Sequence, residues 1–242
     1  MKTLLWFTGI AIAVSGVGQA AVMPCVSGSY ASYLAIAGMG CSVGGELFSG
    51  FSTLPVPVGS TPLPTSITVS PITAASAPGL LFTLNTTATA RQTLEAFLAF
   101  NVTTLPGGNS IAGTLLTQNG GTATGDGGVV GIESVCLGAA FTAAGTCPGT
   151  PASRNLGTFA LSGIPPQTSD SLTFPPSSLA GITGDFSLTG GTNGTAAVTS
   201  FGIQVNATGP ASAVPEPATL FVTGSGLLGL AITRRKRKVV LQ

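Results

Sequence analysis

The chain has 242 residues, of which only 6% are charged, against roughly 25% in ordinary globular proteins. Its 35 glycines and 17 prolines, together with many Val, Ile, Leu, Phe and Thr residues, favour short strands separated by turns over solvated disorder. Between the two ends of the chain lie two arginines, six carboxylates and no lysine, a net charge of −4 that excludes an electrostatic surface for nucleic acid.

The first 20 residues are typical of a secretory signal peptide. Lys2 gives a positive start, an apolar run extends from Leu4 to Val14, and Gly18-Gln19-Ala20 has the small-x-small pattern of a cleavage site. The apolar run is short for a membrane span. We therefore expect signal peptidase to cleave after Ala20, or after the neighbouring Ala21, and an exported domain to occupy residues 21–212.

Four cysteines follow the leader, an even number that indicates two disulfides in an exported protein. Four cysteines allow three pairings, and we favour the two local ones, each worth about 3 kcal/mol by loop entropy. A zinc site is the alternative, but the sequence has no C-x-x-C pair and no histidine, so we expect no metal. The favoured pairs are Cys25–Cys41 and Cys136–Cys147.

Apolar stretches between turn signals predict about eight short strands and therefore an all-β fold, a single jelly-roll-like β-sandwich. In the stretch 94–102 the alternation favours a strand, although a short helix starting near Thr93 is left open. Pro165-Pro166 and Pro175-Pro176 are assigned to loops, and the region Pro55 to Pro64 to an exposed loop. The other expected strands are 67–69, 80–84, 111–117, 129–136, 156–161, 185–189 and 201–208.

The C-terminus combines three features in order. Val214-Pro215-Glu216-Pro217 precedes an apolar stretch from Ala218 to Ile232, and a basic run closes the segment. As a helix the stretch covers roughly 22 Å, less than the roughly 30 Å of a hydrocarbon core, so its insertion is marginal. Basic residues stay cytoplasmic, which leaves everything before Pro217 on the outer side. The basic run is Arg234, Arg235, Lys236, Arg237 and Lys238.

This tail, residues 213–238, resembles the PEP-CTERM sorting signal of Gram-negative bacteria: the Pro-Glu-Pro motif, a short glycine-bearing membrane helix and a basic cluster. The resemblance implies recognition by an exosortase at the Pro-Glu-Pro motif and cleavage near it. It also implies a precursor anchored in the inner membrane, followed by delivery to the cell surface or to an exopolysaccharide matrix.

Residues that carry chemistry are scarce in the body. Histidine is absent, so a serine–histidine–aspartate triad is excluded. Glu95 with Glu133, or Asp170 with Asp185, are the carboxyl pairs that a glycosidase would need. Gly125 to Gly128 around Asp126 lacks the further oxygen ligands of a calcium loop. We therefore expect no catalytic residue, no cofactor and no enzyme activity.

A non-catalytic surface or matrix component is accordingly the function that the sequence favours. The alternative is a carbohydrate-binding module for exopolysaccharide. Such a module stacks exposed aromatic rings on sugars, but Trp6, the one tryptophan, lies in the leader. Tyr30, Tyr33 and the phenylalanines are the rings that remain for this role.

Overall fold

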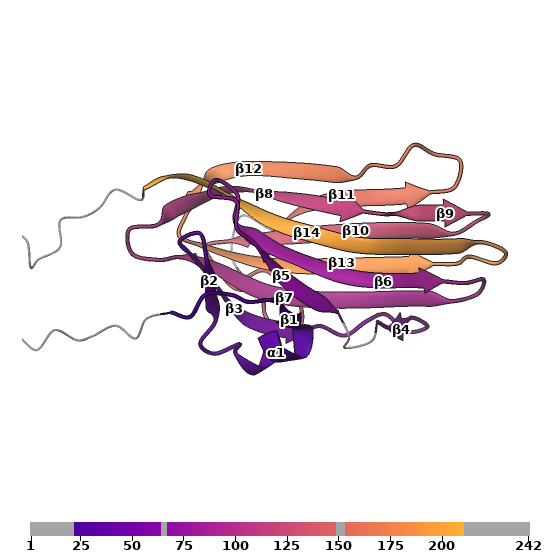
Figure 1. Cartoon of the computed structure of the whole chain (residues 1–242), viewed down its shortest axis with the longest axis horizontal. Coiled ribbons are helices and arrows are strands. Elements are labelled where there is room, and N and C mark those ends of the chain that lie inside the picture. Colours follow the sequence, from indigo (N-terminus) through magenta and orange to yellow (C-terminus); the bar gives the residue numbers. More distant parts are fainter. Residues whose placement is uncertain (1–21, 64–66, 149–152, 211–242) are drawn as a thin grey trace, which may run out of the picture.

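The computed structural model describes residues 22–63, 67–148 and 153–210, and this region is almost entirely β-structure (Figure 1). Its one helix is α1 (Tyr30–Ala35). The strands are β1 (Gly28–Ser29), β2 (Cys41–Val43), β3 (Glu46–Thr53), β4 (Thr61–Pro62), β5 (Thr68–Ile72), β6 (Gly79–Ala88), β7 (Thr93–Thr104), β8 (Asn109–Asn119), β9 (Thr122–Thr124), β10 (Gly128–Leu137), β11 (Arg154–Leu161), β12 (Ser169–Ser177), β13 (Leu179–Thr189) and β14 (Thr195–Pro210).

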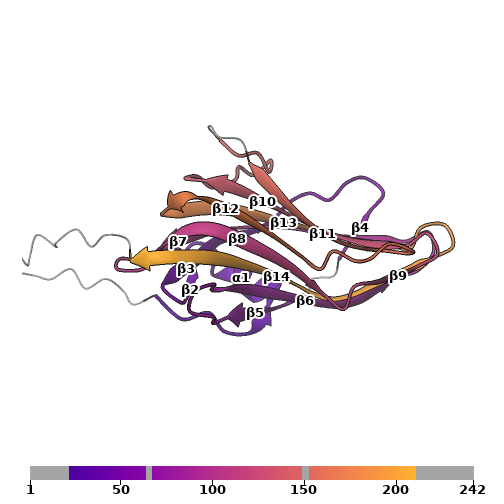
Figure 2. The ribbon, with the colours of Figure 1, turned by 90° about the horizontal axis from the view of Figure 1, so that it is seen from above.

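The strands form two sheets that pack face to face as a sandwich (Figure 2). Sheet 1 has the order β1-β5-β6-β14-β8-β12, with β9 on β14. Sheet 2 has the order β11-β10-β13-β7-β3-β2, with β4 parallel to β7. The long strands from β6 to β14 cross repeatedly between the sheets, and early strands pair with late ones: β6 with β14, and β7 with β13. This is the double Greek key of a jelly roll, so the predicted fold class is confirmed.

The interior follows the two-residue period of the strands. Phe201, Ile203 and Val205 of β14 face inward and are buried, whereas the side chains between them face out, as the alternation in the sequence predicts. Phe186 and Phe201 stack across the two sheets with ring centroids 4.3 Å apart. Gly131 faces this pair, and a Cβ there would come within 2.5 Å of the Phe201 ring. The aromatic pair therefore requires glycine at position 131.

Each strand expected from the sequence is present, usually longer than the apolar stretch that indicated it. The stretch near Thr93 is strand β7 rather than a helix, because Leu94, Ala96 and Leu98 line the core at a period of two. The loop assignment of Pro175-Pro176 is wrong. Both prolines lie in β12, an edge strand whose register shifts between Thr173 and Ser177, where missing N–H groups are tolerated.

The region Pro55 to Pro64 is exposed over much of its described length, as expected, but it is also tied to sheet 2. Leu54 N–H donates to Phe97 O at 2.8 Å, and Leu63 N–H donates to Glu95 O at 2.6 Å. Across the described ranges, no helix has the length and apolar character needed to cross a membrane. The expected signal peptide (1–20) and sorting signal (213–238) lie outside the described residues.

Candidate functional site

The carboxyl groups are the candidate reactive groups of the sandwich body, and most of them are buried or half-buried. Glu46 and Glu133 have no exposed surface and Glu95 is 5% exposed, while Asp170 and Asp185 are half-buried. Burial raises the pKa of Glu46 to about 7, although the Thr104 hydroxyl opposes the shift. The arginines Arg91 and Arg154 are exposed and do not share this interior.

Glu133 lies inside the sandwich, on the inner face of β10. Burial raises the pKa of Glu133 to about 8, and the negative charge of Asp170 adds to the shift. The Thr114 hydroxyl lies close enough to oppose the shift, but its geometry falls outside a hydrogen bond. Three further buried side chains face the same interior without a hydrogen-bond partner for their polar atoms: Thr114 and Gln118 of β8, and Thr158 of β11.

Glu95 and Asp185 form a second group, on the outer face of sheet 2. In the register of β7 and β13, Glu95 lies opposite Ser187 and Asp185 lies two residues further along. Burial raises the pKa of Asp185 to about 6, and the nearby carboxyl of Glu95 raises it further through its charge and a hydrogen bond.

Neither of the carboxyl pairs that a glycosidase could have used is formed. Glu95 and Glu133 lie on opposite faces of sheet 2, since β7 turns Glu95 outward and β10 turns Glu133 inward. Asp185 meets Glu95, and Asp170 is the carboxyl that affects Glu133. The alternation of Val129, Glu133 and Val135 on one face of β10 was the available signal that Glu133 is an interior residue.

The two remaining carboxylates hold the backbone. Asp126 accepts hydrogen bonds from the N–H groups of Thr192 (2.7 Å) and Asn193 (2.9 Å), which lower the pKa of Asp126 and join the turn before β10 to the turn before β14. Asp170 accepts one from Gly157 N–H at 2.9 Å and so ties edge strand β12 to β11. The glycine run 125–128 is thus a turn stabilised by its aspartate.

A cavity of about 360 Å³ opens beside α1 and the segment that follows β3. Its walls are mostly apolar, and Glu95 is the carboxyl-bearing residue that lines it. Asp185, which lies beside Glu95, is not part of the lining. The principal lining residues are Tyr30, Leu34, Leu54, Leu63 and Phe97.

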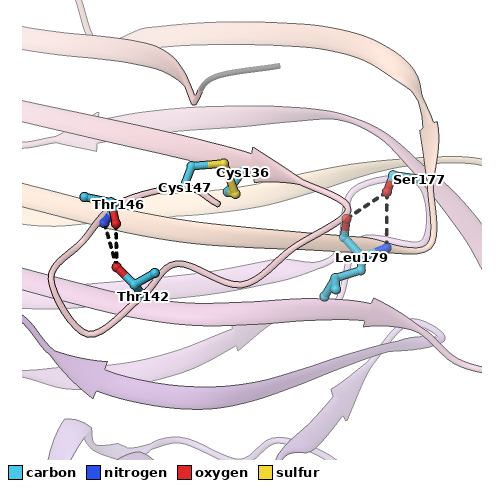
Figure 3. The surroundings of a disulfide bond; sticks show 6 residues. All are labelled: Cys136, Thr142, Thr146, Cys147, Ser177 and Leu179. Atoms are coloured by element: carbon cyan, nitrogen blue, oxygen red, sulfur yellow. Dashed lines mark hydrogen bonds between the residues drawn. A yellow bond between two sulfur atoms is a disulfide. The ribbon is translucent and has the colours of Figure 1, made fainter. Parts of the chain in front are cut away.

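Both disulfides have the pairing that the sequence favours. Cys25 is joined to Cys41, and Cys136 to Cys147. The second disulfide closes the loop drawn in Figure 3. This loop is tied to β13, where Gly181 N–H donates to Ala139 O at 3.0 Å. Within the loop the hydroxyls of Thr142 and Thr146 are 2.7 Å apart. The four sulfurs are consequently structural, and within the described part of the chain no cysteine is free.

Among the described residues no group of three or more Cys, Asp or Glu side chains is arranged to hold a metal ion. The expected sorting residues Val214 to Pro217 and the basic residues Arg234 to Lys238 lie outside the described residues. The structure therefore places the disulfide residues and the carboxyl groups, while the sorting segment is known by its sequence.

Comparison with known proteins bears on two parts of the chain. The enzymatically active domain of tailspike protein 4 from bacteriophage CBA120 is 12% identical, with a TM-score of 0.23. The match covers 66% of this chain and 19% of that one, so the chain spans about a fifth of the tailspike chain, and the likeness is too weak to support an argument. No curated protein matches the chain.

The C-terminal segment gives a specific result. Residues 213–238 match the family model of the PEP-CTERM protein-sorting motif. The matched segment contains the Pro-Glu-Pro sequence, the apolar stretch and the whole basic run, in the order described above. The motif implies export, anchoring in the membrane through the C-terminus, and processing by an exosortase. The chain is therefore a protein that carries the PEP-CTERM sorting motif, joined to an all-β sandwich.

Proposed function

We propose that the sandwich is a non-catalytic component of the cell surface or of the extracellular matrix, delivered there by exosortase processing of the C-terminal tail. The observation that carries the proposal is the sorting motif at residues 213–238, which begins almost directly after the last strand ends at Pro210. Because the connection is so short, the folded body is the part of the protein that the sorting signal delivers.

A non-catalytic role is supported by the state of the reactive groups. Both disulfides remove the thiols, and the sequence has no histidine. Glu46 and Glu133 have no exposed surface, and Asp126 and Asp170 accept hydrogen bonds from backbone N–H groups. Such groups stabilise a fold more readily than they transfer protons to a substrate.

Among the described residues, the aromatic rings that a carbohydrate-binding module would use are not exposed. Tyr30 and Tyr33 are buried, at 3% and 2% exposure, and both pack edge-on against Phe51 in the core. Across the described ranges, no phenylalanine or tyrosine is exposed. A stacking platform for sugar rings would therefore need a different surface, one rich in hydroxyl and amide groups, and we do not favour it.

The test is co-expression with an exosortase, followed by the intact mass of the extracellular protein. We expect a product that begins after Ala20 or Ala21, ends near the Pro-Glu-Pro motif, and is about four hydrogens lighter than the reduced chain. Pro217→Ala should block the release, whereas Ser212→Ala, a control outside the motif, should not. A membrane-bound product that still carries Arg234 to Lys238 would refute sorting.

A further inference from the structure

Exposed apolar side chains gather beside the first disulfide. Met23 is 57% exposed, Val26 is 69% exposed and Met39 is 70% exposed, whereas large apolar residues elsewhere in the described body are mostly buried. We call these three residues the apolar patch. A cavity of about 380 Å³ with a largely apolar wall adjoins it. The wall is formed by Met23, Pro24, Val26, Tyr33, Ile36 and Cys41.

Both described ends of the chain leave the sandwich at the same end, the end at which β2 lies (Figures 1 and 2). Ser42 N–H donates to Met23 O at 2.8 Å, which fixes the patch beside β2. The turn after β2 contacts the turn after β7, where Leu105 N–H donates to Gly45 O at 3.0 Å. The next strand, β8, begins at Asn109, opposite Pro210 at the end of β14.

The length of the connection to the tail limits where the membrane can be. Seven residues separate Pro210 from Ala218, the start of the apolar stretch, and when fully extended this connection spans at most roughly 27 Å. The sandwich is longer than this, because the 12 residues of β7 extend over about 40 Å. When the tail is in the bilayer, the end that carries the patch is therefore the end that faces it.

Charge favours a lipid surface over an ionic partner. The exposed charged residues of the described body are Arg91, Asp126 and Arg154. Arg91 and Asp126 lie at the opposite end, in contact with the turn before β14. Arg154 is on β11, at the edge of sheet 2 opposite β2. An uncharged apolar surface close to a bilayer lowers its free energy by entering the interfacial region.

We propose that Met23, Val26 and Met39 form a docking surface for the lipid bilayer that anchors the tail, so that the precursor lies against the membrane until it is sorted. This inference rests on the proposed function, because it requires a tail that is held in the membrane before processing.

The test uses the precursor with its tail intact, reconstituted into phosphatidylcholine vesicles with and without brominated acyl chains. The precursor is prepared without residues 1–20, which removes Trp6 and the apolar leader, so a single new tryptophan reports its own surroundings and flotation reports the tail. Met39→Trp places the reporter in the patch. Ile164→Trp is the matched control, because Ile164 is also an exposed apolar residue (52%) and follows the far end of β11. Neither site is packed in the core.

We expect brominated lipid to lower the emission of Met39→Trp at least twofold and to leave that of Ile164→Trp unchanged. A precursor that floats with the vesicles but shows no quenching at position 39 would overturn the docking surface and leave the proposed function intact. If brominated lipid does not quench the tryptophan at position 39, but that tryptophan becomes shielded from iodide as the protein concentration rises, the patch would be assigned to contact with a second copy of the chain. A precursor that does not float would refute the membrane-held step, and both proposals with it.

Discussion

Replacing Glu133 with Gln tests whether the buried carboxyl sets the pH dependence of stability. The pKa of Glu133 is about 8 in the folded protein, against an ordinary value of 4.5. A group whose pKa is raised by folding contributes stability at low pH, and that contribution is lost as the pH rises from the unfolded to the folded pKa. One pKa unit corresponds to about 1.4 kcal/mol, so ionising Glu133 costs up to about 5 kcal/mol above pH 8.

Glu133→Gln removes the ionisation and keeps the shape of the side chain. We expect the variant and the wild type to have similar free energies of unfolding near pH 4.5, where Glu133 is protonated. Above pH 8 the variant should be several kcal/mol more stable. Urea titrations at pH 4.5, 6, 7.5 and 9 measure the difference directly.

Asp126→Asn is the control with the opposite sign. Backbone N–H groups lower the pKa of Asp126, so its contribution is present above the ordinary aspartate pKa and is lost as the pH falls through the lowered folded value. The residual slope of Glu133→Gln between pH 5 and 8 should come from Glu46 and Asp185. A wild-type stability that does not fall between pH 4.5 and 9, or a slope that Glu133→Gln leaves unchanged, would refute the reasoning.

Three further changes test the packing. Cys136→Ser with Cys147→Ser should lower the free energy of unfolding in urea by about 3 kcal/mol, and a reductant, which also opens Cys25–Cys41, should lower that of the wild type further. Gly131→Ala should lower the free energy of unfolding by about 1–3 kcal/mol, because the added Cβ would meet the Phe201 ring. Gly157→Ala is the control and should be near neutral, since nothing lies within 4 Å of a Cβ at that position. Equal effects of the two substitutions would contradict the contact with Phe201. Tyr30→Phe removes the hydroxyl that donates to Ser52 O at 2.8 Å and should cost about 1 kcal/mol, measured as a shift in the urea midpoint.

The sequence predicts the sandwich well because inward-facing apolar residues alternate with outward-facing residues along its strands. In β14 and β7 the inward residues recur at a period of two, and glycine-rich turns separate the strands, so fold class and strand positions follow from nearest neighbours along the chain. The two disulfides are predictable for the same reason, since each joins cysteines only 16 or 11 residues apart.

The carboxyl arrangement could not be predicted because it depends on which strands become neighbours. Glu95 meets Asp185 only because β7 pairs with β13, a register between residues about 76 to 96 positions apart in the chain. The burial of Tyr30 and Tyr33 likewise depends on α1 packing against Phe51. The edge position that tolerates the prolines of β12 is a property of the whole sheet, and a local reading of Pro175-Pro176 therefore assigned them to a loop.

The position of β14 links folding to the sorting tail. β14 is inserted between β6 and β8, which pair with it and not with each other, so sheet 1 is incomplete until residues 195–210 are in place. The matched sorting segment begins three residues beyond Pro210, so in an exported chain the last strand leaves the membrane together with the start of the signal that retains it. A chain held back before Pro210 would expose the edges of β6 and β8, two long strands without charged side chains, and such edges pair readily with other chains. Because the last strand and the Pro-Glu-Pro motif are so close along the chain, we expect the sandwich to be complete before the motif is cleaved.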